Sequence, residues 1–533
     1  MRRTVVTVLA PLLLVAGLAL PSRAASSPYA GFVAEHSYVA TPFGDLYVEY
    51  HRPAHGRMPV LLQMSPYRYV YGRVRAQGVA TDFYSARYAP KGYAIAYADV
   101  LGTGESSGCW DYGGPAEAAA GAAVVEWLGT RSWSNGRVGM IGTSYDGATQ
   151  AEIATLAPPH LAAIVPQEPV TSWYGYNYDH AVTHNSTDDD PSPTDTGYPV
   201  GTPDVFDLAL SRTPNTDPDR DPGQHLSNGA DKASECEAIE HNLRGHLADP
   251  SYGGFWRDRD WALRAGKVKA AVLMQQGWRD FNTKPDQFTR YWLSLRGAAD
   301  RRAVVGQWDH TDVFADDLRG SPAGSLRDYL DAFFARHLKG APASVLKPYP
   351  PVMSQGYDGR WRTSLPLATR HTRFTGTMDV PFVNSGTETS KAWKHLPLGT
   401  DPNAATLVSA PLRVPLRLVG AGQVQVDVSV QSVRGQLDAT LLDVAPDDSV
   451  RVITLGLLDL RYAGSPAAPR ALVPGQVNRV TVVLRPQDAV VAAGHRIAVV
   501  LTGSEAVWGV PDPVAGQLYE VRRVRMELPL VKP

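Results

Sequence analysis

Short apolar runs recur through the first two-thirds of the chain, separated by longer segments with a helical pattern. Six such runs lie at residues 59–64, 93–100, 137–141, 161–165, 269–275 and 302–306. Because a continuous apolar run suits a strand that is buried on both faces, these runs predict a parallel sheet. Helical patterns lie between several of them, for example at residues 115–130 and 284–298. The succession of strand, helix and strand predicts a doubly wound α/β sheet.

One long interval, residues 172–266, interrupts this alternation and is rich in Asp, Pro, Tyr and Trp. A loop of that length without structure of its own is uncommon in a compact domain. We therefore expect a mostly helical cap, with Asp- and Pro-rich segments, inserted into the α/β domain.

After about residue 368 the pattern changes to short strand-like runs with turns between them. Val, Leu, Gly and Pro dominate, and long helical patterns disappear, which predicts an all-β domain of the jelly-roll type. The α/β domain is then split in two by the cap and followed by the β domain. The expected bounds are residues 35–171 and 267–367 for the α/β domain, 172–266 for the cap and 368–533 for the β domain.

The first 24 residues have the pattern of a secretory signal peptide. A basic start, MRR, precedes an apolar run, and the small residues Ser22 and Ala24 follow it. We expect cleavage after Ala24, a secreted protein, and no membrane attachment afterwards. A membrane anchor is the alternative, but the run is short for a span and is broken by Pro11 and Gly17.

Charge and cysteine content narrow the picture further. A net charge of −2 over 533 residues gives no electrostatic case for nucleic acid or an anionic membrane as a partner. The chain has two cysteines, Cys109 and Cys236. In the oxidising compartment that export implies, such a pair tends to form a disulfide; two free thiols are the alternative.

The segment MIGTSYDGATQ, residues 140–150, leaves an apolar strand at a serine between two glycines and continues as a plausible helix. That context is typical of a nucleophile on a sharp strand-to-helix turn, which makes Ser144 the candidate. The second glycine, Gly147, comes three positions after the serine, one later than in the general motif. The literal match GESSG at residues 104–108 follows a glycine-rich loop and precedes no helix, so we interpret it as a loop.

A serine nucleophile needs a general base and an acid that orients the base. In this fold class they follow the serine in the order acid, then histidine, each at the carboxyl end of a strand. Asp280 and His310 meet that requirement after the runs at 269–275 and 302–306. Asp309 and Asp312 also flank His310, but neighbours on one loop rarely point correctly. We expect a triad of Ser144, Asp280 and His310.

The developing oxyanion of an acyl transfer needs hydrogen-bond donors. The backbone N–H of Tyr145, directly after the serine, is the first candidate. The second is expected from the loop after the run at 59–64, where the sequence SPYRY offers the hydroxyl of Tyr67. A packed aromatic ring is the alternative for Tyr67.

The Ser144 segment and the SPYRY loop resemble the X-prolyl dipeptidyl aminopeptidase and cocaine-esterase-like family of serine hydrolases. The resemblance extends to YADVLGTGESSG at 97–108, GWRDFNTKPDQFTRYW at 277–292 and the C-terminal LLDVAPDD at 441–448. The resemblance implies an α/β-hydrolase domain with a helical cap, followed by a β jelly roll. It places the family's triad on Ser144, Asp280 and His310, and its tyrosine oxyanion donor on Tyr67.

The family includes peptidases and esterases. The segments DFNTKPDQ and PVTSWYGYNYD resemble the prolyl-dipeptidase branch, which favours release of Xaa-Pro dipeptides from peptide amino termini. An esterase or amidase acting on small acyl substrates is the alternative, and a non-catalytic surface or glycan-binding protein is a third.

Proline has a rigid ring that a compact pocket can select. Trp173 and Tyr174 are expected to form part of that pocket, or else to hold the cap on the sheet. An acid should bind the substrate's amino terminus, and Glu168 and Asp179 are the candidates.

Two further patterns occur in the cap, and no cofactor or metal is expected. Asp217, Asp219 and Asp221 are spaced as in a calcium loop, but prolines interrupt them and the bidentate Glu is missing, so a solvated loop is favoured. Asn185–Thr187 matches a glycosylation sequon.

Overall fold

The computed structural model describes residues 29–68, 83–184, 230–280, 282–310, 318, 320–367, 371–388, 398–510 and 515–531. The expected signal peptide, the Asp-rich segment 216–223 and the sequon at Asn185 lie outside these residues. In the described part of the chain, no helix is long and apolar enough to span a membrane.

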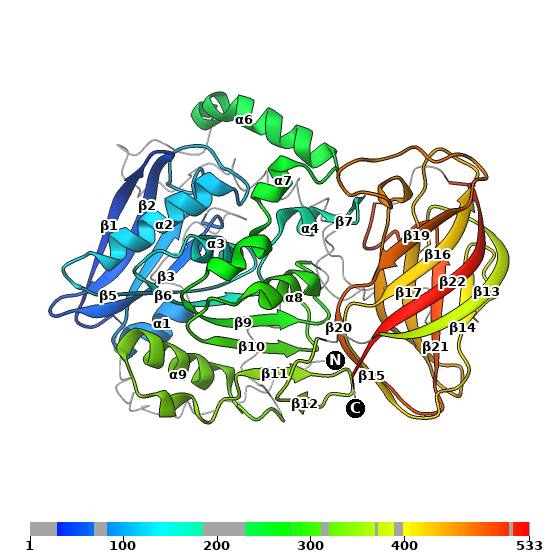
Figure 1. Cartoon of the computed structure of the whole chain (residues 1–533). Helices are drawn as coiled ribbons and strands as arrows, with labels where there is room; N and C mark the ends of the chain where they lie inside the picture. Colours follow the sequence, from blue (N-terminus) through cyan, green and yellow to red (C-terminus); the bar gives the residue numbers. More distant parts are fainter. Residues whose placement is uncertain are drawn as a thin grey trace, which may run out of the picture.

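The first two-thirds of the chain contains a ten-stranded mixed sheet (Figure 1), in the order β1-β2-β4-β3-β5-β6-β9-β10-β11-β12. The strands from β4 to β11 in that order are parallel, as the continuous apolar runs predict. β1, β2 and β12 add antiparallel pairs at the two edges. The strands are β1 Phe32–Thr41, β2 Gly44–Pro53, β3 Met58–Ser65, β4 Ala94–Asp99, β5 Ser134–Thr143, β6 Leu161–Gln167, β9 Ala271–Gly277, β10 Arg301–Gly306, β11 Val352–Gln355 and β12 Trp361–Arg362.

Helices cover both faces of this sheet, so the doubly wound prediction is confirmed. α2 (Pro115–Gly129), α3 (Tyr145–Thr155) and α8 (Pro285–Ser294) share one core cluster with the alternate strand residues Leu62 and Met140. α1 (Phe83–Tyr88) and α9 (Leu326–Lys339) share the opposite cluster with their sequence neighbours Leu61 and Ile141. Because side chains alternate along a strand, these neighbours lie on opposite faces.

The described part of the cap is mostly helical. It contains α4 (Trp173–Asn177), α6 (Ala230–Ala248), α7 (Gly254–Asp258) and the 3₁₀ helix Trp261–Lys267. A short hairpin that the sequence pattern did not predict, β7 (Tyr178–Asp179) with β8 (Val182–Thr183), follows α4. The expected disulfide is present and joins Cys109, in the loop after β4, to Cys236 in α6.

The C-terminal third of the chain is an all-β domain of two antiparallel sheets, as the sequence predicts. One has the order β19-β16-β22-β15-β20 with β13 beside β22, and the other the order β14-β21-β17-β18. Val424 and Val426 of the first sheet share a core with Leu441 and Val499 of the second. The strands are β13 His371–Val383, β14 Ala405–Val408, β15 Leu416–Gly420, β16 Gln423–Val430, β17 Asp438–Val444, β18 Val450–Gly456, β19 Asn478–Val483, β20 Gln487–Val491, β21 Arg496–Thr502 and β22 Leu518–Val531.

The β domain packs against the carboxyl ends of the parallel strands, where β9, β10 and β11 point towards it (Figure 1). Gln487 of β20 donates a side-chain hydrogen bond to the carbonyl of Trp278, directly after β9. Gln307, directly after β10, donates to the carbonyl of Asp488 at 3.3 Å. Ser354 of β11 donates to the Asp488 carboxylate at 2.8 Å. These contacts hold the β domain against the strand ends that carry the candidate triad residues.

Candidate active site

Ser144 stands between the end of β5 and the first residue of α3, with the strained backbone angles φ 63° and ψ −121°. Its amide donates to the carbonyl of Gln167 on the neighbouring strand β6 at 2.9 Å. A Cβ at Gly142 would lie 2.5 Å from the Cβ of Asp146, and one at Gly147 would lie 2.7 Å from the carbonyl oxygen of Gln167. The two glycines therefore permit the tight turn, and strain of this kind concentrates at functional sites.

The competing segment GESSG is a structural loop. Ser106 is buried; its hydroxyl donates to the carbonyl of Asp99 at 2.9 Å and accepts from the amide of Tyr47 at 2.9 Å. The hydroxyl of Ser107 accepts from the amide of Asp45 at 2.7 Å. Both serines thus fix this loop against β2.

Four neighbouring parallel strands end at the candidate site. β5, β6, β9 and β10 lie side by side in the sheet, and they are followed by Ser144, Glu168, Asp280 and His310, respectively. Because the carboxyl ends of parallel strands meet at one edge, the fold gathers these residues although up to 166 positions (310 − 144) separate them in the chain.

Asp280 is fully buried, and its Oδ2 lies 3.0 Å from Nδ1 of His310. The same oxygen accepts from Thr283 Oγ1 at 2.6 Å and Gln276 Nε2 at 3.0 Å, while Oδ1 accepts the amide of Asn282 at 2.9 Å. Burial by itself raises the pKa of Asp280. The charge and hydrogen bond of His310, with the bonds from Thr283, outweigh burial and lower the pKa below its usual value. Asp280 is therefore an ionised carboxylate that can hold the imidazole by its Nδ1–H.

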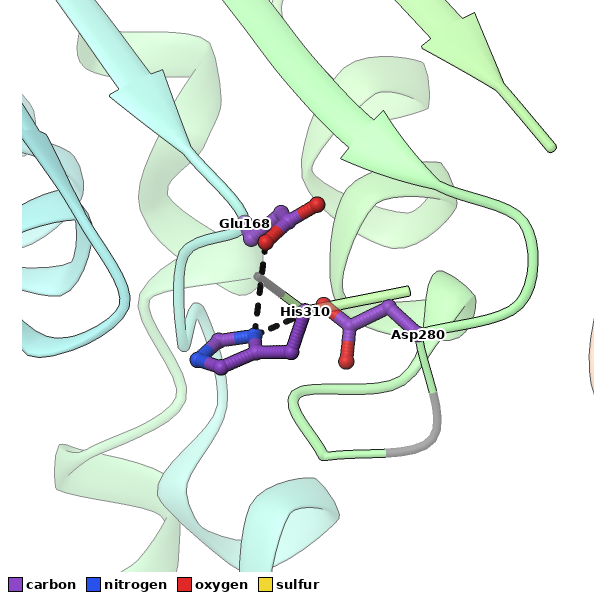
Figure 2. A group of neighbouring side chains, drawn as sticks. All are labelled: Glu168, Asp280 and His310. Atoms are coloured by element: carbon purple, nitrogen blue, oxygen red, sulfur yellow. Dashed lines mark hydrogen bonds and ion pairs between the residues drawn. The ribbon is translucent and has the colours of Figure 1, made fainter. Parts of the chain in front are cut away.

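A second carboxylate, that of Glu168, faces the same imidazole nitrogen. The sequence did not predict this contact. Glu168 follows β6 with a φ of 46°, is fully buried, and places its Oε2 3.4 Å from Nδ1 of His310. Its Oε1 accepts a hydrogen bond from Trp308 Nε1 at 2.9 Å. Figure 2 shows both carboxylates converging on one ring nitrogen while the other nitrogen faces away. The sequence made Glu168 a candidate for binding the substrate's amino terminus; in the structure it lies beside His310, the candidate base.

Glu168, Asp280 and His310 each offer one potential metal-ligand atom within 4.8 Å of the others. The Asp280 oxygen in this set already accepts bonds from Thr283 and Gln276, and its 3.0 Å distance to Nδ1 is a hydrogen-bond length. The donor set thus fits an acid–imidazole pair better than a metal site.

Tyr67 follows β3, the strand beside β5, and its half-buried ring packs edge-on against Tyr145 with 6.4 Å between centroids. The next residue, Arg68, fixes this loop. Its buried guanidinium donates to Asp99 at 2.7 Å and to Glu49 at 2.9 Å. It also lies over the rings of two tyrosines. The Tyr67 loop is therefore anchored by a neighbour whose role the sequence did not reveal.

The side chain of Tyr145 points away from the elbow. Its hydroxyl donates to the carboxylate of Glu117 on α2 at 3.0 Å and accepts from Trp110 Nε1 at 2.8 Å. Tyr145 is the first residue of α3, and amides at this end of a helix lack an intrahelical acceptor. Its backbone N–H is thus suited to an oxyanion, as the sequence predicts for this position.

Burial raises the pKa of Glu117 to about 7, and the charge of Asp111 adds to the effect. On α3, burial and the charge of Glu117 raise the pKa of Glu152 well above its usual value. The two carboxyl groups form a buried pair beneath the elbow. In the sequence, both look like ordinary polar positions on a helix.

The aromatic residues after β6 separate into two environments. Trp173 is buried, with its ring 4.9 Å from that of Tyr145 and 4.6 Å from that of Tyr112. Tyr174 lines a cavity of about 680 Å³ between the cap, α8 and the β domain. Asp179 also lines that cavity, but it is paired with Arg485 at 3.0 Å. A contact of Trp173 or Tyr174 with substrate stays a prediction.

Comparison with known proteins gives two family matches. Residues 45–312 match the X-Pro dipeptidyl-peptidase (S15 family) model, and residues 260–525 match the C-terminal non-catalytic domain of X-Pro dipeptidyl-peptidase. A protein of Streptomyces avermitilis with the provisional name Xaa-Pro dipeptidyl-peptidase is 25% identical to this chain. The matched region covers 89% of this chain and 78% of the Streptomyces protein.

Two solved structures share the fold over nearly the whole chain. An aminopeptidase from a marine sediment archaeon, Thaumarchaeota archaeon, has a TM-score of 0.69 at 17% identity. The superposed region covers 97% of this chain and 99% of the aminopeptidase chain. A CocE/NonD family hydrolase from Staphylococcus aureus has a TM-score of 0.69 at 16% identity and covers 94% of each chain.

Proposed function

Because this chain belongs to the X-Pro dipeptidyl-peptidase (S15) family, and is thus a serine hydrolase, we propose that it releases Xaa-Pro dipeptides from peptide amino termini with Ser144 as nucleophile. The observation that carries the proposal is the strained Ser144 elbow together with a His310–Asp280 pair of 3.0 Å, all of which follow parallel strands at the same carboxyl edge of the sheet.

In the proposed mechanism, Nε2 of His310 takes the proton of the Ser144 hydroxyl as the serine oxygen attacks the carbonyl carbon after proline. Asp280 holds the Nδ1–H and stabilises the imidazolium. The backbone N–H of Tyr145 and the hydroxyl of Tyr67 donate to the oxyanion. His310 then returns the proton to the leaving amine, and a water molecule, activated by the same base, hydrolyses the acyl-enzyme.

The family assignment and the name of the Streptomyces relative favour Xaa-Pro peptides as substrates. The same triad would also hydrolyse small acyl esters. Which of the two substrate classes is used depends on the pocket around the proline ring and the amino terminus.

A substrate panel tests the assignment. The enzyme should cleave Ala-Pro and Gly-Pro arylamides and ignore their N-acetylated forms, since acetylation removes the charge that a dipeptidase must recognise. Ser144→Ala should lower the rate by about three orders of magnitude or more and abolish fluorophosphonate labelling. Ser107→Ala, in the competing GESSG segment, is the matched control and should be labelled normally.

Equal rates on free and acetylated arylamides would contradict the dipeptidase assignment. A preference for simple esters over both would identify an esterase with the same triad. Labelling that persists in Ser144→Ala would contradict the nucleophile itself.

We also propose that the protein is exported and loses residues 1–24. The N-terminal pattern supports this, and so does the Cys109–Cys236 disulfide, because disulfides are typical of oxidising compartments. Mass spectrometry of protein from culture medium should give an amino terminus at Ala25; an intact terminus on intracellular protein would contradict export.

A further inference from the structure

Nδ1 of His310 faces two carboxylates, although it carries a single proton. Asp280 Oδ2 lies at 3.0 Å and Glu168 Oε2 at 3.4 Å from this atom. The shorter contact makes Asp280 the acceptor of the Nδ1–H. Glu168 then acts on the ring through its charge, from the side of β6 (Figure 2).

The backbone and side chain of Glu168 are both held in place. Its amide donates to the carbonyl of Gln275 at the end of β9 at 2.9 Å, and its Oε1 accepts the Trp308 Nε1–H at 2.9 Å. These bonds direct Oε2 towards the imidazole. A φ of 46° is costly for a glutamate, so the surrounding structure stabilises a conformation that the residue would not adopt by itself.

A buried carboxylate is costly unless a donor or a cation balances it. Glu168 is fully buried, and its Oε2 forms an ion pair with His310 when the ring is protonated. Against a neutral imidazole, the charges of Glu168 and Asp280 repel each other. When the ring takes a proton at Nε2, it becomes a cation between two anions, and both contacts turn favourable.

We propose that Glu168 is a positioning residue that, together with Asp280, stabilises the His310 imidazolium formed when the base accepts the proton of Ser144. The inference rests on the proposed triad and deepens it. The proton moves from the Ser144 hydroxyl to Nε2 while the Nδ1–H stays in place, so Glu168 adds charge stabilisation without taking part in proton transfer.

Among the described residues, the charged groups placed against His310 are Asp280 from the β9 loop and Glu168 from the β6 loop; Asp309 precedes it in its own loop. Removing the charge of Glu168 makes the imidazolium less stable. The imidazole of His310 then loses its extra proton at a lower pH than in the wild type. The step that forms the imidazolium also becomes slower.

Glu168→Gln keeps the shape of the side chain and an acceptor for Trp308 but removes the charge. We expect kcat on a Gly-Pro arylamide to fall about tenfold with little change in KM, and the acidic limb of the kcat/KM profile to move to lower pH by about one pH unit. In Asp280→Asn, adding Glu168→Gln should lower the residual rate at least a further tenfold. Glu126→Gln is the matched control, because Glu126 pairs with His160 at 2.8 Å away from the site; it should change neither quantity.

An unchanged acidic limb in Glu168→Gln would overturn the inference, and so would a rise in KM confined to substrates with a free amine, which would make Glu168 a substrate-binding residue. Should Glu168→Gln fail to fold, Glu168→Asp serves instead. This variant keeps the charge, so the acidic limb of its kcat/KM profile should stay close to the wild-type position. A shift of the limb as large as the one expected for Glu168→Gln would overturn the inference. Wild-type protein that fluorophosphonate does not label at Ser144 would contradict the proposed triad as well.

Discussion

The rings of Tyr67 and Tyr145 are in edge-on contact at the elbow, and we propose that the two residues supply different groups to the oxyanion. The phenol of Tyr145 is held by Glu117 and Trp110, so its backbone is the part suited to the site. Tyr67 has a half-buried ring on a loop that Arg68 anchors. In the proposed mechanism, Tyr145 donates its backbone amide to the oxyanion and Tyr67 donates its hydroxyl. This division of roles rests on single side-chain contacts.

Removing the hydroxyl of Tyr67 tests its part in this arrangement. We expect Tyr67→Phe to lower kcat about a hundredfold, corresponding to roughly 3 kcal/mol of lost transition-state stabilisation, with KM nearly unchanged. Steady-state kinetics on the preferred arylamide would measure both. Tyr38→Phe, in β1 at the edge of the sheet, is the control and should retain wild-type rates. A raised KM with unchanged kcat would make Tyr67 a binding residue.

The elements that carry the candidate triad could be predicted because each candidate residue follows a continuous apolar run. Asp280 and His310 come shortly after β9 and β10, and the predicted runs at 269–275 and 302–306 overlap those strands closely. The contact of Glu168 with His310 could not be predicted in this way. It depends on β6 lying beside β9 in the sheet and on a positive φ, and neither leaves a pattern in the sequence.

Buried polar groups within helices were equally hidden. Every residue of α3 is buried, so this helix has no polar face to reveal its orientation. Glu152 lies in its interior, and Glu117 faces it from α2. The antiparallel edge strands β1 and β2 were missed for a related reason, because their half-exposed positions interrupt any continuous apolar run.

The glutamate pair between α2 and α3 predicts a pH dependence of stability. In the folded protein the pKa of Glu117 is raised from 4.5 to about 7, mainly by burial, so folding favours the protonated form. The folded state therefore binds more protons than the unfolded state between these values, and this carboxyl lowers stability as pH rises from about 4.5 to about 7. Glu117→Gln removes the penalty. The variant's stability relative to wild type should rise across that interval and level off above it.

Denaturant midpoints at a series of pH values would measure this difference. Glu237→Gln, a change to an exposed carboxyl on α6, is the control and should give no pH-dependent difference. A difference between Glu117→Gln and wild type that stays constant from pH 4.5 to pH 7 would contradict the raised pKa.

At the scale of the whole molecule, the β domain contacts both the strand ends and the cap. Gln487 bonds to the carbonyl of Trp278, two residues before Asp280. Arg485, just before β20, donates to Asp179 in the cap hairpin at 3.0 Å, and both side chains are buried. The β domain is therefore part of the frame that holds the Asp280 loop and the cap together, although its family model is named non-catalytic.

Breaking the Arg485–Asp179 ion pair tests whether the β domain supports the cap. Burial raises the pKa of Asp179, but the charges of Arg485 and His180 outweigh it and hold the pKa well below its usual value. Arg485→Met would leave a buried carboxylate without this partner, which typically costs about 3 to 5 kcal/mol. The loss should be largest at neutral pH and shrink towards acid pH, where Asp179 can take up a proton.

Denaturant unfolding, read by tryptophan fluorescence together with limited proteolysis of the cap, would measure the effect of Arg485→Met. Arg479→Met is the matched control, because Arg479 pairs with Asp427 at 2.8 Å on the exposed surface of the same domain and its loss should change little. Loss of the Arg485 pair should also lower activity, since the cap and the Asp280 loop would lose a shared support. Equal, small effects of the two substitutions would mean that this ion pair does not hold the β domain against the cap.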